Sequence, residues 1–117
     1  MLAPAIAFDD LFPKGRVDVV KIDVQGSEHL VVEGMVKALR RSPNVHVVVE
    51  FGLQMFDSSG IQPMSVLGAY RHMGFEVYWL HRDGLRSESD AELVRAARSA
   101  GPSGQLNLIL RWKQVGR

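Results

Sequence analysis

Three carboxylates follow two β-branched segments of the chain, and they are the side chains best placed to do chemistry. Asp23 lies near the end of the segment VDVVKIDV (17–24), Glu28 follows five residues later, and Glu50 lies near the end of VHVVVEF (45–51). In open α/β sheets, ligands bind outside the carboxyl ends of the strands, which is where these residues fall. Carboxylates placed there could act as a general base, as a group that positions a hydroxyl, or as ligands of a divalent metal ion.

Each carboxylate also has a purely structural interpretation. Glu28 falls in the first turn of a predicted helix, where the helix dipole favours an anion, so it could simply cap that helix. Asp23 could accept hydrogen bonds from backbone N–H groups of the turn that contains Gln25 and Gly26. Glu50 could be a solvated group at a strand end, because a carboxylate inside an apolar strand is costly unless it is paired or lies at the rim. The residues alone leave both interpretations open.

Other common chemical motifs are missing from the sequence. The histidines have neither HxxxH nor HxH spacing, so structural roles are expected for His29, His46, His72 and His81. There is no cysteine, which excludes disulfides, thiolate metal sites and a cysteine nucleophile. No glycine pattern of the GxGxxG or GxxxxGK[ST] type follows a strand, so no phosphate-binding loop is predicted.

The elements that would position the carboxylates alternate along the chain. Hydrophobic patterning predicts strands at 17–24, 45–51, 75–80 and 105–112, helices at 27–40, 63–73 and 90–100, and a loop at 52–62. This alternation predicts an α/β fold of about four strands with flanking helices, in which the last pair of strands is antiparallel. The near-continuous Val and Ile residues of the first strand indicate burial on both faces.

Length and charge limit the classes of protein that fit. The chain has 117 residues, which favours one domain spanning 1–117, and a net charge of +1. A balanced charge gives no electrostatic reason to expect nucleic acid or an anionic membrane as a partner. No apolar run approaches the ~20 residues of a membrane span, and no signal-peptide pattern is present. A cytoplasmic location is therefore expected.

Several segments together resemble a known family. They are FDDL at 8–11, VDVVKIDVQGSEHLVVEGM at 17–35 and PNVHVVVEF at 43–51. They are similar to a part of the FkbM-type methyltransferases that contains an LDDL-like segment, a KIDVEGAE strand and turn, and a strand that ends in Glu. The resemblance implies a Rossmann-like sheet, S-adenosylmethionine as cofactor, and O-methylation of a hydroxyl on a small molecule or glycan.

The resemblance also implies that part of the family domain precedes this segment. The family's glycine-rich cofactor loop and its cofactor-binding acidic residue lie upstream of the segment that Phe8 begins to match, so the chain resembles the C-terminal half of the domain. Weak or absent cofactor binding is then expected of the chain alone, and its cofactor-binding residues stay unknown. Asp23 is the first candidate to position or deprotonate the acceptor, with Glu28 and Glu50 as second choices.

Without a preceding strand, the strand at 17–24 would form a sheet edge, and a homodimer through that edge is expected. Two other functions stay open. One is a non-catalytic remnant that serves as a dimerisation or interaction module. The other is a divalent-metal site made by the three carboxylates.

Overall fold

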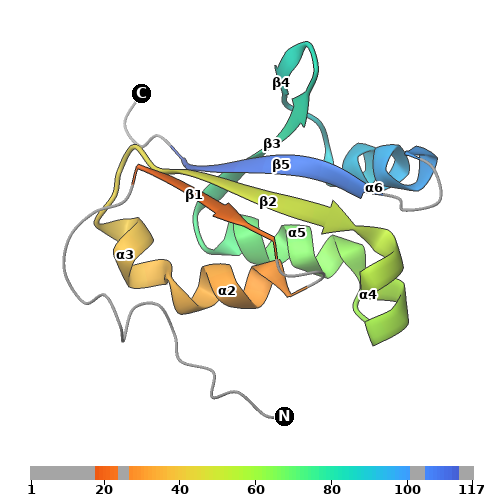
Figure 1. Ribbon diagram of the computed structural model, residues 1–117, viewed down its shortest axis with the longest axis horizontal. Coiled ribbons are helices and arrows are strands. Elements are labelled where there is room, and N and C mark those ends of the chain that lie inside the picture. Colours follow the sequence, from red (N-terminus) through yellow and green to blue (C-terminus); the bar gives the residue numbers. More distant parts are fainter. Residues whose placement is uncertain (1–17, 24–26, 101–104, 114–117) are drawn as a thin grey trace.

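The computed structural model describes residues 18–23, 27–100 and 105–113 (Figure 1). Strands and helices alternate along most of the chain. In chain order the elements are β1 (Val19–Ile22), α2 (Glu28–Gly34), α3 (Val36–Arg40), β2 (His46–Gly52), α4 (Leu53–Ser59), α5 (Pro63–His72), β3 (Phe75–His81), β4 (Gly84–Arg86), α6 (Asp90–Ser99) and β5 (Gln105–Trp112).

The strands form one mixed sheet in the order β1-β2-β5-β3-β4. β1 and β2 are parallel, whereas β5 lies between β2 and β3 and is antiparallel to both. The α/β class and the antiparallel pairing of the last two predicted strands are therefore confirmed. Among the described strands, β1 and β2 form the one parallel pair. The carboxyl ends of this pair are therefore the expected ligand-binding edge of the sheet.

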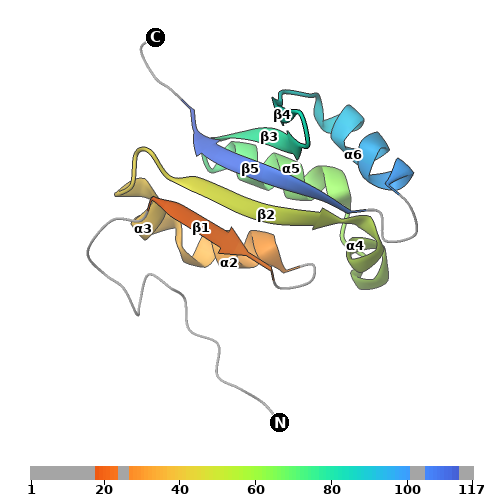
Figure 2. The same ribbon diagram turned by 45° about the horizontal axis from the view of Figure 1, so that its top comes forward.

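The helices pack on one face of the sheet and bury it. Figures 1 and 2 show α2, α3 and α5 lying along that face, and α6 adds Leu93 and Ala97 to the same core. Along β2 the burial alternates, so that Val47, Val49 and Phe51 are inaccessible while the residues between them are half-buried. This alternation separates a helix-covered face from a second, more open face that carries polar side chains.

The first strand and helix differ from the sequence prediction. β1 lies at one edge of the described sheet and Val19 is 67% exposed, so the expected burial on both faces is wrong. The predicted single helix at 27–40 is divided at Met35, whose φ of −107° and ψ of 5° leave the helical region. Gly34 has low helix propensity and precedes this break. Leu30 of α2 is 58% exposed although it is a large apolar residue.

Two short elements were not predicted. The segment 52–62, expected to be a loop, contains helix α4, which buries Leu53 and Phe56 at i, i+3 spacing and ends at Gly60 with a left-handed φ of 71°. Arg82 and Asp83 turn the chain into a hairpin, so that β4 pairs with the end of β3 and becomes a fifth strand. None of the helices described here is long and apolar enough to cross a membrane.

The end of β5 is joined firmly to the helical layer through Trp112. Its indole Nε1 donates a hydrogen bond of 2.7 Å to the carbonyl of Leu39, and its ring stacks on Phe75 at 4.0 Å between centroids. Gly74, with a φ of 107°, turns the chain directly beside this indole. Trp112 is therefore a half-buried aromatic residue that packs against the core, with its ring held in one orientation.

Candidate active site

Asp23 and Glu50 become neighbours because their strands are parallel and in register. Ile22 pairs with Val49, so the next residue of each segment, Asp23 and Glu50, falls on the same open face of the sheet. Asp23 is exposed, whereas Glu50 is half-buried. The register alone therefore brings together two carboxylates that are 27 positions apart in the sequence.

Glu28 completes the group from the first residue of α2. Its side chain is only 2% exposed, the lowest exposure of any charged residue in the described chain. One carboxylate oxygen from each of Asp23, Glu28 and Glu50 lies within 4.8 Å of the other two. We refer to these three residues as the carboxylate cluster. All three candidates from the sequence are thus brought together, although the turn residues Gln25 and Gly26 lie outside the described residues.

The cluster changes the protonation of Glu50. Partial burial, a hydrogen bond with Asp23 and the negative charges of Asp23 and Glu28 all raise the pKa of Glu50, and a hydrogen bond with Gln105 partly opposes them. The raised pKa keeps Glu50 protonated to a higher pH than an isolated glutamate, so this group can exchange a proton with a neighbouring oxygen.

Tyr70 lies close enough to Glu28 to feel its charge, and no sequence motif marks this residue. It belongs to α5 and is 1% exposed, and burial together with the charge of Glu28 raises the pKa of its phenol. Tyr70 therefore stays neutral beside a buried carboxylate. In the sequence it looks like one more large residue on the apolar face of a helix.

The interpretation of Glu28 as a simple helix cap is only partly supported. Ser27 occupies the N-cap position, but its side chain makes no capping hydrogen bond. Glu28 does lie in the first turn, where an anion is favoured. Its nearly complete burial, however, exceeds what a role as an exposed helix-terminal charge requires.

No described histidine belongs to the carboxylate cluster, and His29 has an unusual environment. The Nδ1 atom of His29 is buried without a hydrogen-bond partner among the described residues. Its ring meets Phe56 edge-on, with 6.4 Å between centroids. His72 is exposed near the end of α5, and His81 pairs with Asp83 at 3.4 Å. None of these contacts forms a metal site.

The mixed sheet with flanking helices is consistent with a partial Rossmann-like α/β fold, and the cluster lies at the carboxyl ends of its parallel strands, where such sheets bind ligands. The family model of the methyltransferase FkbM domain matches residues 2–82, well over half of the chain. The chain therefore belongs to the FkbM methyltransferase family, and the whole carboxylate cluster lies within the match. No curated protein and no solved structure matches the chain significantly.

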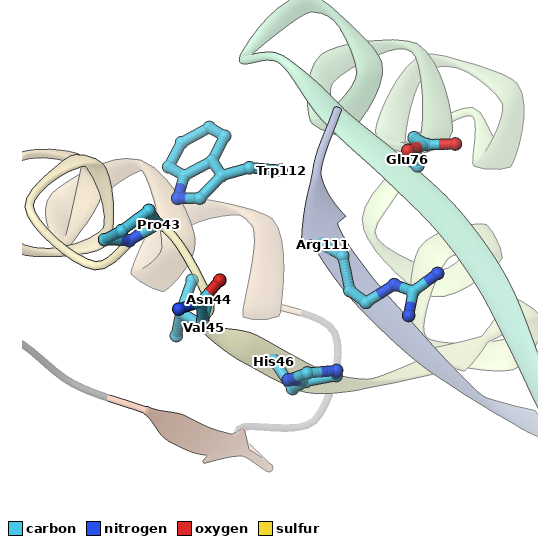
Figure 3. Close-up of a pocket in the computed structure, with 7 residues that line it drawn as sticks. All are labelled: Pro43, Asn44, Val45, His46, Glu76, Arg111 and Trp112. Atoms are coloured by element: carbon cyan, nitrogen blue, oxygen red, sulfur yellow. The ribbon is translucent and has the colours of Figure 1, made fainter. Parts of the chain in front are cut away.

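Membership in this family implies a cofactor of the S-adenosylmethionine type. The described residues do not form a complete cradle for it. The edge of the sheet that carries the cluster offers three acidic side chains. The cavity found among the described residues lies at the other end of β2 (Figure 3). An adenosyl group needs an apolar slot with a few convergent polar groups, which the cluster alone does not supply.

Proposed function

We propose that this chain is the C-terminal part of an S-adenosylmethionine-dependent O-methyltransferase domain whose acceptor site includes the carboxylate cluster. The observation that carries the proposal is the convergence of Asp23, Glu28 and Glu50 at the carboxyl ends of β1 and β2, in a chain of the FkbM methyltransferase family. The acceptor is a hydroxyl of a small molecule or glycan, and the protein acts in the cytoplasm.

Different exposures suit the three carboxylates to different tasks. Asp23 is exposed, so an acceptor can reach it, and its carboxylate accepts the hydrogen bond of the acceptor hydroxyl. The proton that the hydroxyl loses passes to the carboxylate of Asp23, which lies next to Glu50 in the same cluster. Glu28 is buried and acts as a positioning residue, because its negative charge lies next to Asp23 and Glu50 and adds to the negative potential at the acceptor site. The cofactor, when bound, supplies the activated methyl group.

The assignment to the C-terminal part makes a prediction about cofactor binding. If the groups that hold adenosine and the methionine carboxylate belong to a preceding segment of the family domain, this chain alone binds S-adenosylmethionine weakly or not at all. Isothermal titration calorimetry with the 117-residue chain checks this. A dissociation constant of about 1 μM, equivalent to about −8 kcal/mol, would show that the chain has a complete cofactor site and would overturn the C-terminal assignment.

A second candidate function is favoured by the close approach of the carboxylates. Oxygens of three acidic residues within 4.8 Å of one another could hold a divalent cation such as Mg²⁺ or Mn²⁺. Titration of the chain with Mn²⁺ separates the two functions. Tight binding that is abolished in Asp23→Asn would support metal-dependent chemistry, whereas a cluster that only positions a hydroxyl binds the ion no more tightly than an ordinary acidic surface.

The position of β1 at the edge of the described sheet predicts that the chain associates with a second copy. A non-catalytic dimerisation module would show the same association. β1 forms an edge of the described sheet, and Val19 on it is 67% exposed. An edge strand without a covering element pairs readily with another strand. We expect a homodimer through β1 at micromolar concentration, measured by light scattering, and we expect Val19→Lys to give a monomer.

The matched control for this prediction is Leu30→Lys, because Leu30 is also a strongly exposed apolar residue but lies on α2 rather than on the strand edge. It should leave the dimer intact. A wild-type monomer whose β1 amides exchange freely with solvent would contradict pairing through this edge. Dissociation by both variants would point to general surface hydrophobicity instead.

A further inference from the structure

A cavity of about 290 Å³ opens at the end of the sheet opposite to the carboxylate cluster (Figure 3). It lies where β2 begins and β5 ends, and it is lined by Pro43, Asn44, Val45, His46, Glu76, Arg111 and Trp112. His46 and Glu50 are four residues apart on β2, which corresponds to about 13 Å along a strand. The cavity is therefore separate from the cluster, and its size is close to the ~300 Å³ lower end of small-molecule sites.

Two opposite charges line this cavity without neutralising each other. Glu76 and Arg111 are direct partners across the antiparallel β3–β5 pair, so their side chains leave the same face of the sheet. Cross-strand partners of opposite charge commonly form an ion pair. Within the described chain, however, no ion pair joins Glu76 to Arg111, although each has a partner of another kind.

Tyr78 keeps the two charges apart. Its hydroxyl donates a hydrogen bond of 3.0 Å to Oε2 of Glu76, and the guanidinium of Arg111 lies over its ring, 4.5 Å from the centroid. The ring holds the guanidinium through a cation–π contact, which leaves the N–H groups at its rim able to donate. Glu76 likewise keeps acceptor capacity on its other oxygen. The cavity thus presents a fixed anion beside a fixed cation.

The opposite wall of the cavity is apolar and rigid. Figure 3 shows the indole of Trp112 near Pro43 and Asn44, on the other side of the cavity from the side chains of Arg111 and His46. The indole is held by its hydrogen bond to Leu39 and by stacking on Phe75. A ring that is already ordered binds an apolar group without the entropic cost of being immobilised.

We propose that this cavity binds a small zwitterion, namely an amino acid or related compound that carries an ammonium group, a carboxylate and an apolar side chain. The ammonium group pairs with Glu76, and the carboxylate accepts hydrogen bonds from Arg111 and from His46 beside it. The apolar side chain packs against Trp112. A simple anion is a poorer fit, because Glu76 repels it, and a simple cation is repelled by Arg111 in the same way.

The experiment is a titration of the ¹⁵N-labelled chain with L-phenylalanine, followed by the NMR resonances of the Trp112 indole and of the β3 and β5 amides. We expect saturable shifts with a dissociation constant of about 1 mM. The wild-type chain is then titrated with 3-phenylpropionate, which lacks the ammonium group, and with 2-phenylethylamine, which lacks the carboxylate. Each should bind about 10-fold more weakly, since each loses one charge-assisted contact.

Variants locate the two contacts. Glu76→Gln should abolish the preference for L-phenylalanine over 3-phenylpropionate, and Arg111→Gln should abolish its preference over 2-phenylethylamine. Glu92→Gln and Arg95→Gln are matched controls. These two exposed residues of α6 form an ion pair of 2.9 Å, so they carry the same two kinds of charge, but neither lines the cavity. Both controls should bind like the wild type.

Two results would overturn the proposal. One is the absence of shifts around the cavity at about 10 mM L-phenylalanine, ten times the expected dissociation constant. The other is equal binding of L-phenylalanine and 3-phenylpropionate to the wild type, which would indicate an unselective anion site. If a variant fails to give a folded spectrum, the three ligands on the wild-type chain still decide the question.

Discussion

Asp23→Asn is expected to lower kcat/KM for methyl transfer by the protein that contains this domain by about 10²–10⁴-fold, the range over which general bases contribute. The asparagine keeps the size and most of the polarity of the side chain but cannot take up a proton. Because Asp23 is exposed, the substitution removes little packing, so the melting temperature should hardly change. Kinetic assays with S-adenosylmethionine, combined with thermal unfolding, measure both quantities.

The control for this prediction is Asp83→Asn on the β3–β4 hairpin, whose side chain is 71% exposed and lies outside the cluster. It should leave kcat/KM unchanged. If Asp23→Asn instead lowers activity and melting temperature together, the carboxylate stabilises the turn after β1 rather than the acceptor. An unchanged kcat/KM would remove Asp23 from the acceptor site altogether.

Glu50→Gln is expected to lower activity and, at neutral pH, to raise stability. The negative charges of Asp23 and Glu28 repel an ionised Glu50, and an amide relieves this repulsion, by up to about 1 kcal/mol for like charges on neighbouring strands. Sites that gather like charges for function commonly reduce the stability of the fold in this way. Denaturant unfolding at pH 7 measures the gain, and the methyl-transfer assay measures the loss.

The same carboxyl group predicts a pH dependence of the wild-type stability. Its pKa in the folded protein is raised above the ordinary value of 4.5, so the folded state binds the proton of Glu50 more tightly than the unfolded chain does. This contribution to the free energy of unfolding is fully present below pH 4.5 and is lost as the pH rises through the raised pKa. The difference in unfolding free energy between Glu50→Gln and wild type should grow over that interval. A difference that stays constant with pH would contradict the raised pKa of Glu50.

Much of the sheet was predictable because its strands carry strong local signals. The strand Gln105–Trp112 has the predicted bounds, and the strands that begin near residues 45 and 75 were found to within one residue at each end. Alternating or continuous Val, Ile, Leu and Phe residues define such strands, whatever their neighbours are. The grouping of the three candidates could also be predicted, because Asp23 and Glu50 follow the apolar runs of two strands and Glu28 begins the helix after the first of them.

What the sequence could not supply depends on contacts between distant segments. Helix α4 has only seven residues, so its periodicity is too short to distinguish it from a loop, although Gly60 does mark its end. The burial of Glu28 beside Tyr70 arises from the packing of α2 against α5. The separation of Glu76 from Arg111 by Tyr78 depends on the β3–β5 register, which no local pattern encodes.

The most direct test of the proposed function is the fate of the methyl group. The complete protein that contains this chain is incubated with S-adenosylmethionine labelled with ¹³C in the methyl group and with a panel of small hydroxyl compounds and glycans. The products are then analysed by mass spectrometry and NMR. A labelled methyl group on a hydroxyl oxygen, formed by the wild type and strongly reduced in Asp23→Asn, is the result expected here. A label on nitrogen or carbon, or oxygen methylation that is undiminished in Asp23→Asn, would contradict an O-methyltransferase whose acceptor site is the carboxylate cluster.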